Sequence, residues 1–420
     1  MPHVAGLRGV VAEQAKVAGV VAKPLELAKG LADGTLTRDA SRAVYRYHQV
    51  FSGGGRTFTR KSFACAVRLS NWTDGEIRGH EEVSTAGREH YLARIRANKG
   101  HVDAIVCGVR DPATEVERIF RGIESGRPTL DVTTPDGTVH KLWRSNSAEL
   151  IGKLRAYFTP KKLHLLEGHD LYDAMLAYRD ELAAKAPLSM YSSANYGLAY
   201  IVTLDDPGII SAPAHRVISG TAAKSADVLA AAKQHFFIEK IAGGATDIAK
   251  LHAALADTVA HQPTFIVVFS NEPDAWKLTL SPDVSPINEG IKADRAVAKL
   301  DPFVIEHLFV AKHLGGGTSV VERDAAVAVA ALAKGASVAL ITRPLTIQQI
   351  THVDELGERM PAHSTAFHPP IAQGLVSFVV DADEDVAGVV RDRVAGQRVA
   401  TDFVAGSFAL NRRTSSGRSA

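Results

Sequence analysis

Residues 356–370, LGERMPAHSTAFHPP, gather several side chains that could do chemistry. Arg359 could bind an anion, and the hydroxyls of Ser364 and Thr365 could form hydrogen bonds to a ligand. Pro361 breaks any helix that runs into the segment, and neither a helical nor a strand-like period survives across it. Because polar loops on rigid scaffolds commonly carry binding sites, we predict a site here. The alternative is a solvated connector.

A second candidate is the turn at Gly168 and His169. The apolar run LHLL precedes Glu167, and helix-compatible residues follow His169 at once, which predicts a strand, a glycine turn and a helix start. A helix N-terminus offers unpaired backbone N–H groups and a favourable dipole, so it accepts phosphate. Gly168 would let the backbone approach a ligand closely. The alternative is that His169 only caps the helix or contacts a neighbour.

Two further candidates carry carboxylates. Glu26 follows Pro24, which fixes the backbone beside it, and the Glu26 carboxylate could act as a general base toward a substrate hydroxyl. The alternative interpretation of Glu26 is an acid at a helix N-terminus. His80 and Glu81 lie together in a polar segment, where they could join a site or remain surface polar groups.

The composition indicates a globular protein without a preference for polyanions. The chain has 420 residues, 46% hydrophobic and 22% charged, and this length suggests two domains. Lys and Arg number 48 against 46 Asp and Glu, so no bulk field draws the chain to nucleic acid or anionic lipid. Cys65 and Cys107 lie in apolar contexts, which favours buried free thiols over a zinc site or a disulfide. Because the N-terminus does not resemble a secretory signal and no apolar run reaches the roughly 20 residues of a membrane span, we expect a cytoplasmic protein.

Periodicity and turn signals predict a mixed α/β (α+β) protein. An Ala-rich texture begins after Gly220, so we predict an N-terminal domain over 1–220, a second α/β domain over 221–410 and a disordered tail over 411–420. Residues 10–30 are predicted as a helix-prone entry into a strand-like VVAKP. Other predicted strands are 43–50, 59–69, 102–109, a hairpin over 128–143, 200–203, 264–270, 275–280, one near 320, and 338–342. The predicted helices are 88–98, 112–125, 147–158, 171–184, 225–239, 246–258, 302–314, 325–334 and 347–356.

Several of these segments resemble, in the same order, a family called domain of unknown function 1015 (DUF1015). The loop 356–370 is similar to its signature G-E-R-M-P-x-K-S-T-x-F-x-P, and residues 20–27, VVAKPLEL, are similar to its V-V-A-P-P-Y-D-V. The His-Glu pair at 80–81, LLEGHDLYDAML at 165–176 and NYGLAYIVTLDDPGIISAPAHRV at 195–217 match the family as well. The similarity covers nearly the whole chain, and the motifs together are specific for the family.

The family in turn resembles the ParB/sulfiredoxin-like superfamily, which implies such a fold for the N-terminal domain. Members of that superfamily hold nucleotide phosphates with a Gly-His-His-Arg loop, and some phosphorylate free serine. This chain keeps Gly168 and His169 but has Asp170 and Leu171 where the second His and the Arg would stand. Leucine cannot replace a guanidinium fork, and Asp170 adds a negative charge beside the phosphate position, which argues against full activity. We expect this helix start to face solvent or ligand.

The resemblance implies roles for other residues too. Glu26 stands where the family has Asp, and Arg88 stands where it has Lys. His215 and Arg216 are retained from the family's P-x-H-R, so Arg216 could supply the missing phosphate fork. In the loop 356–370, His363 replaces a Lys, while the neighbouring Arg, Ser and Thr are kept.

These features together predict a nucleotide-dependent phosphotransferase that acts on a small hydroxylated metabolite, with free serine as the leading guess and ATP or ADP with Mg²⁺ as cofactor. The alternative is a catalytically inactive family member that binds a nucleotide or phosphometabolite in a regulatory role. No nucleic-acid or membrane partner is expected, no residue is assigned to a protein-bound metal, and no feature points to an oligomeric state. The predicted catalytic residues are Glu26, His80, Glu81 and His169, in one cleft with Arg216, and the predicted phosphate- or nucleotide-binding residues are Gly168, Arg88, His215, Arg216, Arg359, Ser364 and Thr365.

Overall fold

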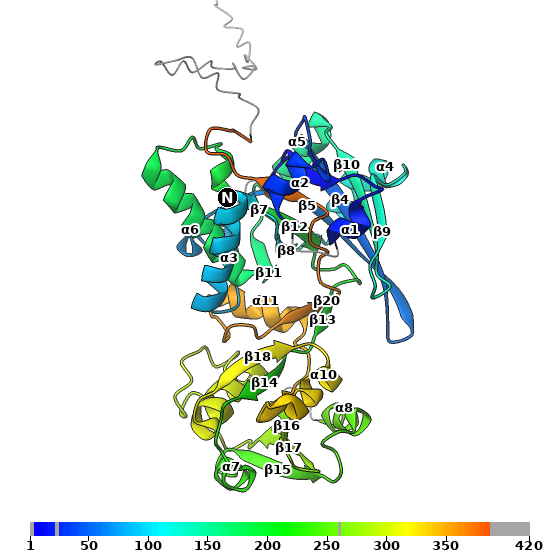
Figure 1. The fold of residues 1–420 in the computed structure, drawn as a ribbon. Helices are drawn as coiled ribbons and strands as arrows, with labels where there is room; N and C mark the ends of the chain where they lie inside the picture. Colours follow the sequence, from blue (N-terminus) through cyan, green and yellow to red (C-terminus); the bar gives the residue numbers. More distant parts are fainter. Residues whose placement is uncertain (1–3, 22–24, 259–261, 387–420) are drawn as a thin grey trace, which may run out of the picture.

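The computed structural model describes residues 4–21, 25–258 and 262–386. Its helices and strands form a mixed α/β protein, as predicted. Figure 1 shows two lobes, each built on its own sheet, with helix α11 (Ile347–Glu355) between them. None of the helices within the described ranges is long and apolar enough to cross a lipid bilayer.

The first lobe is built on a nine-stranded sheet. Its strands are β1 (Val4–Ala5), β4 (Val44–Gly53), β5 (Arg56–Arg68), β6 (Ile77–Gly79), β8 (Ile105–Val109), β9 (Leu130–Thr133), β10 (Val139–Ser145), β11 (Leu163–Glu167) and β12 (Tyr196–Thr203). They lie in the order β6-β11-β8-β12-β5-β4-β10-β9, and β1 pairs with β5. The central strand β12 is buried along almost its whole length, as expected for a strand covered on both faces.

Helices of the first lobe bury one apolar stripe each. On α5 (Ala148–Phe158), Leu150, Leu154 and Phe158 recur every four residues and are all buried, while the hydroxyl of Ser147 caps the helix by accepting from the Leu150 amide. Helices α3 (Thr85–Asn98) and α6 (His169–Lys185) pack side by side (Figure 1), and α4 (Glu115–Glu124) packs against α5. The start of α6 is therefore held between the sheet and α3.

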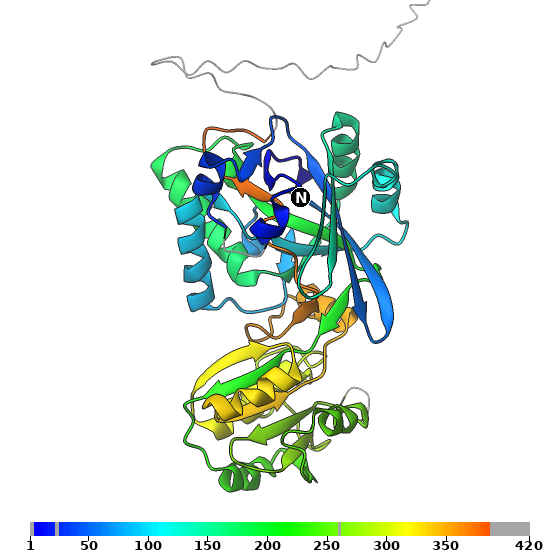
Figure 2. The same ribbon diagram turned by 45° about the vertical axis from the view of Figure 1, so that its right-hand side comes forward.

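The second lobe is built on a six-stranded antiparallel sheet in the order β15-β17-β16-β19-β14-β18. The strands, in that order, are Phe236–Ile241, Ala275–Leu280, Thr264–Phe269, Val338–Ile341, His215–Ser219 and Thr318–Glu322. Along β16, Phe265, Val267 and Phe269 enter one apolar cluster, and Ile266 and Val268 enter another on the opposite face. Helices α8 (Ile248–Ala256) and α10 (Ala325–Ala330) pack on this sheet, with α10 against β14 and β19 (Figure 2), while α7 (Ser225–Ala232) packs against residues 305–314.

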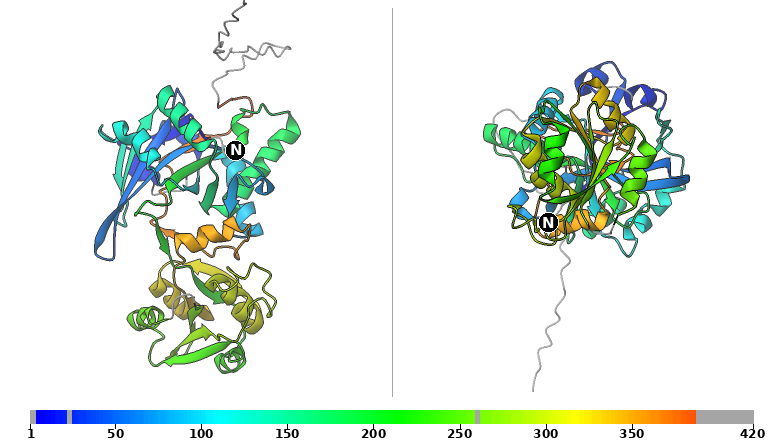
Figure 3. Two further views of the ribbon diagram at one scale, coloured as in Figure 1. Left: turned by 180° about the vertical axis from the view of Figure 1, so that it is seen from behind. Right: turned by 90° about the horizontal axis from the view of Figure 1, so that it is seen from below.

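After the second lobe the chain returns to the first (Figure 3). Strand β20 (Ala366–His368) pairs with β13 (Ile210–Ala212), the last strand before the second lobe. Strand β21 (Ser377–Val379) then joins a four-stranded sheet with β2 (Gly9–Ala12), β3 (Leu36–Arg38) and β7 (Gly100–His101). The loop 356–365 thus lies where the chain passes from α11 back to the first lobe.

Three predicted elements differ from the structure. The helix predicted over 225–239 ends with α7 at Ala232, and β15 follows, because the run Phe236-Phe237-Ile238 favours a strand. The segment predicted over 10–30 as a helix-prone entry into a strand-like VVAKP comprises β2 and two short helices, α1 (Val17–Val21) and α2 (Leu27–Ala32). The first two residues of VVAKP lie in α1 rather than in a strand, and 22–24 lie outside the described residues. The helix predicted over 302–314 is a short helix α9 (Asp301–Val304) followed by a π-helix, η3 (Ile305–Leu314). The predicted tail 411–420 lies outside the described residues.

Candidate functional site

The strand, glycine turn and helix start predicted around Gly168 are present. Strand β11 ends at Glu167, Gly168 has φ of 94°, and α6 begins at His169. A φ in this range is left-handed, where a side chain is disfavoured, and a Cβ on Gly168 would also come within 3.2 Å of the Ile105 Cγ2. Both constraints favour glycine at this turn.

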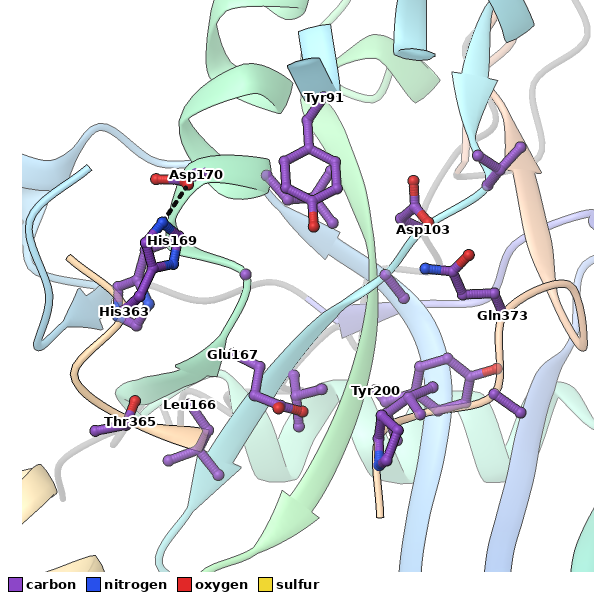
Figure 4. Close-up of a pocket in the computed structure, with 18 of the residues that line it drawn as sticks. Tyr91, Asp103, Leu166, Glu167, His169, Asp170, Tyr200, His363, Thr365 and Gln373 are labelled. Carbon is purple, nitrogen blue, oxygen red and sulfur yellow. Dashed lines mark ion pairs between the residues drawn. The ribbon is translucent and has the colours of Figure 1, made fainter. Parts of the chain in front are cut away.

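The turn opens onto a cavity of about 290 Å³, named here the Gly168 cavity. Figure 4 shows its residues, with the polar ends of Tyr91, Glu167 and Gln373 turned toward the space between them. The walls come from β8, β11, α3, α6, the loop 356–365 and the returning segment 370–376. The lining residues are Glu81, Tyr91, Val102, Asp103, Ala104, Val106, Leu166, Glu167, Gly168, His169, Asp170, Leu171, Tyr200, Arg323, His363, Thr365, Pro370, Ile371, Ala372, Gln373, Gly374 and Val376.

Glu81 ties the loop 356–365 to this cavity. Its carboxylate accepts from the His363 amide at 3.1 Å, from the Thr365 amide at 2.8 Å and from the Thr365 hydroxyl at 2.5 Å. The backbone contributes two further bonds, from the Met360 amide to the His80 carbonyl and from the Glu82 amide to the Met360 carbonyl. His363 has φ of 59°, an unfavourable conformation that these bonds stabilise.

The two histidines beside Glu81 have defined protonation patterns. The Thr365 hydroxyl gives its proton to Glu81, so the Nε2 of His80, at 2.9 Å, must donate to that hydroxyl oxygen. The Nε2 of His169 accepts from the His80 amide, so its Nδ1 carries the proton and points at Glu81 from 3.6 Å. Burial, with His80 nearby, lowers the pKa of His169 to about 3, which keeps this ring neutral.

Glu81 stays ionised in this setting. Burial alone would raise the pKa of Glu81, but hydrogen bonding and the electrostatic influence of His80, His169 and Thr365 outweigh it and hold the pKa at about 2. An ionised carboxylate that accepts several bonds can stay buried because its charge is stabilised by the surrounding donors.

His80, Glu81 and His169 also present one ligand atom each within 4.8 Å of one another. Two imidazoles and a carboxylate can bind a divalent transition metal. Here the Nε2 of His80 donates to the Thr365 hydroxyl and the Nε2 of His169 accepts from the His80 amide, whereas the Nδ1 of His80 is buried without a partner among the described residues. A metal ion on the Nδ1 of His169 would require that ring to change tautomer and give up the bond from the His80 amide. The observed hydrogen bonds therefore favour a hydrogen-bonded cluster over a metal centre.

The residues that depart from the phosphate-loop pattern are buried. Asp170 is 5% exposed, and its Oδ1 accepts from the Ser84 amide at 2.7 Å at the start of α3. Leu171 is 3% exposed and belongs to the apolar core of the first lobe. The helix start was expected to face solvent or ligand: Asp170 and Leu171 are buried from bulk solvent, but both line the Gly168 cavity, so a role facing a ligand stays a prediction. Burial raises the pKa of Asp170, whose Oδ2 lies 3.6 Å from the Nε2 of His363.

The Gly168 cavity is rich in acidic groups. Among the described residues, four carboxylates line it, those of Glu81, Asp103, Glu167 and Asp170, against one guanidinium, that of Arg323. Arg323 lies 3.2 Å from Glu167, and its other bond goes to the Phe367 carbonyl. The hydroxyl of Tyr200, a residue only 1% exposed, has no hydrogen-bond partner among the described residues.

Other predicted site residues in the first lobe lie away from this lining. Glu26 is an exposed N-cap residue of α2 whose side chain makes no cap bond. Arg88 forms an ion pair with Asp173 at 2.9 Å. The guanidinium of Arg359 lies over the Trp72 ring, 4.5 Å from its centroid. Among the residues that the structure describes, the cavity lining includes none of Glu26, Arg88 and Arg359.

The remaining predicted residues belong to the second lobe or its junction. On β14, the Nδ1 of His215 accepts from the Thr342 amide, and burial lowers the pKa of His215 to about 4. Arg216 is 7% exposed and donates to the Ala362 carbonyl at 3.2 Å. Ser364 donates to the Pro361 carbonyl and shares a very small cavity with Arg216, distinct from the Gly168 cavity. The structure thus brings together Gly168, His169, His80, Glu81 and Thr365, and it leaves Arg216 on another face of the loop.

Polar lining residues that were not predicted include Asp103, Glu167, Tyr200, Arg323 and Gln373. They come from separate strands and loops of both lobes, so no local motif joins them. Of these residues, only Glu167 could have been identified as a site residue from the sequence, since it immediately precedes the turn at Gly168.

The family model described as "Protein of unknown function (DUF1015)" matches residues 16–303 of this chain. Among curated proteins, none matches the chain. A solved free serine kinase in complex with AMP has a TM-score of 0.36 at 10% identity, with 73% of this chain and 89% of that chain covered. SbnI with C-terminal truncation from Staphylococcus aureus has a TM-score of 0.39 at 13% identity, with 77% and 91% covered. A conserved hypothetical protein from Pyrococcus furiosus has a TM-score of 0.36 at 12% identity, with 74% and 93% covered.

Proposed function

This chain belongs to the DUF1015 family of proteins of unknown function, and we propose that it binds a small, hydroxylated, amine-bearing metabolite in the Gly168 cavity. The observation that carries the proposal is the set of polar groups that converge there. The buried Tyr200 hydroxyl lacks a partner among the described residues and lines the same cavity as the Glu167 carboxylate. A buried polar group without a partner is costly, and a ligand hydroxyl would supply one.

The charge of the cavity supports an amine on the ligand. Asp103 forms an ion pair at 3.0 Å with Arg94, a residue outside the cavity lining, and Glu167 forms an ion pair with Arg323. Burial raises the pKa of both Asp103 and Glu167, although the paired arginines oppose that effect. An ammonium group in the cavity would stabilise these carboxylates in their ionised form. Free serine, the leading guess from the family resemblance, has the required ammonium and hydroxyl, and its carboxylate would pair with Arg323.

Phosphoryl transfer from ATP or ADP with Mg²⁺ to that hydroxyl is the second candidate. The observation that favours it is the start of α6 at Gly168, where unpaired N–H groups suit a phosphate. The carboxylates argue against it, because each like charge near a phosphate costs on the order of 1–3 kcal/mol. Asp170 holds the Ser84 amide, and Leu171 supplies no cation. The described residues therefore do not fit nucleotide phosphates at this turn, and binding without phosphoryl transfer is the preferred function.

A titration of matched ligands tests the proposal. Serine is compared with glycerate, which replaces the amine by a hydroxyl, and with ethanolamine, which lacks the carboxylate. Calorimetry should give the strongest binding for serine and about tenfold or weaker binding for glycerate. Glu167→Gln should weaken serine binding similarly, whereas Glu355→Gln, a carboxylate outside the cavity paired with Arg110, should not. Glycerate binding as tightly as serine would contradict the amine assignment.

The same protein incubated with ATP or ADP, Mg²⁺ and a panel of hydroxy amino acids distinguishes the two candidates. Saturable amino-acid binding without a phosphorylated product supports the proposed binding function. Formation of a phosphorylated amino acid would instead establish the second candidate, since only group transfer yields that product.

A further inference from the structure

A second cavity, of about 310 Å³, has the opposite charge character. It lies beside α11 and is lined by the segments 295–301 and 343–345 together with two α11 residues. We name it the basic cavity, because its lining, within the ranges that the structure describes, contains Arg295, Lys299, Arg343 and His352 against a single carboxylate, Asp301. Nothing in the Gly168 site uses these residues.

The one carboxylate of the basic cavity is already neutralised. Arg343 lies 3.2 Å from Asp301, donates to the Thr258 hydroxyl at 2.9 Å and donates to the Gln262 carbonyl at 2.8 Å. Asp301 also accepts from the Thr264 amide. This network holds Arg343 in place and leaves Asp301 little capacity to repel an anion.

The other basic residues of the cavity have no such partner. Within the described part of the chain, no acidic group forms an ion pair with Arg295, Lys299 or His352, and all three residues are exposed. The unpaired charges of Arg295 and Lys299 concentrate positive potential at this cavity, although the protein as a whole carries a formal charge of only +2. The N-terminus of α11 adds a positive dipole end beside the cavity residue Gln349.

Apolar residues complete the lining. Leu345 and Val297 are 7% and 1% exposed and belong to the main core of the second lobe, and Leu300 packs against that core. A cavity with an apolar floor and a few polar groups is the usual form of a small-molecule site. An apolar floor below a cationic rim suits a ligand with one flat or apolar part and one anionic part.

We propose that the basic cavity binds a small phosphate-bearing molecule with an apolar body, such as a nucleoside diphosphate. The phosphates pair with the exposed Arg295 and Lys299, and the body lies on Leu300 and Leu345. This site is independent of the function proposed for the Gly168 cavity, because the two share no lining residue.

Calorimetry on the full-length protein tests the site with ADP, AMP, inorganic phosphate and adenosine as probes. ADP should bind most tightly and adenosine should bind at least tenfold more weakly, because it has the apolar body without the charge. Raising the salt concentration should weaken ADP binding, since exposed charges are screened.

Two charge-reversal double variants test whether ADP binds in the basic cavity. Arg295→Glu with Lys299→Glu should reduce ADP affinity by tenfold or more, whereas Lys233→Glu with Lys334→Glu, two exposed lysines outside the cavity, should change it less than twofold. Both variants change the net charge equally and alter only exposed side chains, so folding is preserved in each. Serine binding should be unchanged in the first variant, which separates this site from the Gly168 cavity. The proposal is overturned if no phosphate-bearing probe binds, or if the two variants bind ADP equally.

Discussion

Replacement of Glu81 by glutamine is the sharpest test of how the loop 356–365 is held. The side chain keeps its shape, but only one oxygen remains as an acceptor. In the native protein Oε1 accepts from Thr365, and Oε2 accepts from the His363 amide and faces the protonated Nδ1 of His169. An amide NH₂ on either side would point its protons at other donors. With Glu81 only 6% exposed, water cannot relieve that conflict.

The pKa of Glu81 sets the size of the effect. A shift from 4.5 to about 2 corresponds to about 3 kcal/mol of stabilisation of the ionised group in the folded protein. Since this pKa is lower in the folded than in the unfolded chain, the contribution is complete above about pH 4.5 and is lost as the pH falls toward 2. Glu81→Gln should therefore lower the free energy of unfolding by about 3 kcal/mol at pH 7 and by much less near pH 2.

Urea denaturation at several pH values measures this difference, and amide hydrogen exchange locates it. The amides of His363 and Thr365 should lose protection in Glu81→Gln, because they donate to the altered group. Glu82→Gln is the matched control, since Glu82 is the exposed next residue and its side chain forms no hydrogen bond or ion pair with any residue that the structure describes; its effect should stay within about 0.5 kcal/mol. Unchanged protection of the two amides, or a stability within 1 kcal/mol of the native protein, would refute the role given to Glu81.

Two further predictions concern the Gly168 turn. Gly168→Ala should lower stability by about 1–2 kcal/mol, because of the φ of 94° and the close Ile105 side chain, whereas Gly122→Ala, in open space within α4, should raise it by up to about 1 kcal/mol. Equal effects in urea denaturation would contradict the backbone argument. The double change Asp170→His with Leu171→Arg should lower the free energy of unfolding by about 3 kcal/mol or more, without a gain in ADP affinity. The first substitution removes the acceptor of the Ser84 amide, and the second places a cation in the apolar core. A stable double variant with tighter ADP binding in calorimetry would show that the turn still accepts phosphate.

Much of the fold could be predicted because its signals are local. The apolar spacing on α5 identifies a helix within a short window, and the run TFIVVF, which is rich in β-branched residues, identifies the strand β16 in the same way. The boundary after Ala232 was missed, since the alanines before it continue a helical signal and only the aromatic residues of β15 interrupt it. The pairing of β21 with β2 could not be predicted, because it joins opposite ends of the chain.

The candidate site could also be predicted only in part, because some of its features are local in sequence and others are not. Gly168 and His169 were predicted from the sequence around one turn, and His80 with Glu81 from one short motif. What each side chain contacts depends on segments far away, such as the Thr365 hydroxyl that bonds to Glu81. Burial is likewise a property of the whole fold, so the sequence could not show that Leu171 enters the core.

The two cavities explain why a net charge near zero is a poor guide to the ligands of this protein. Among the described residues, acidic side chains concentrate around the Gly168 cavity and basic ones around the basic cavity, and a net charge of +2 for the whole chain reveals neither. If both proposals hold, a phosphate-bearing ligand is repelled from the first cavity and attracted to the second, and an ammonium group behaves in the opposite way. The helix α11 contacts both regions, since Gln349 lines the basic cavity and Asp354 bonds to His164 of β11, the strand that ends at the Gly168 turn. The glycine turn at Gly168 is thus bordered by four carboxylates among the described lining residues, and this environment is the reason for proposing an ammonium-bearing ligand there.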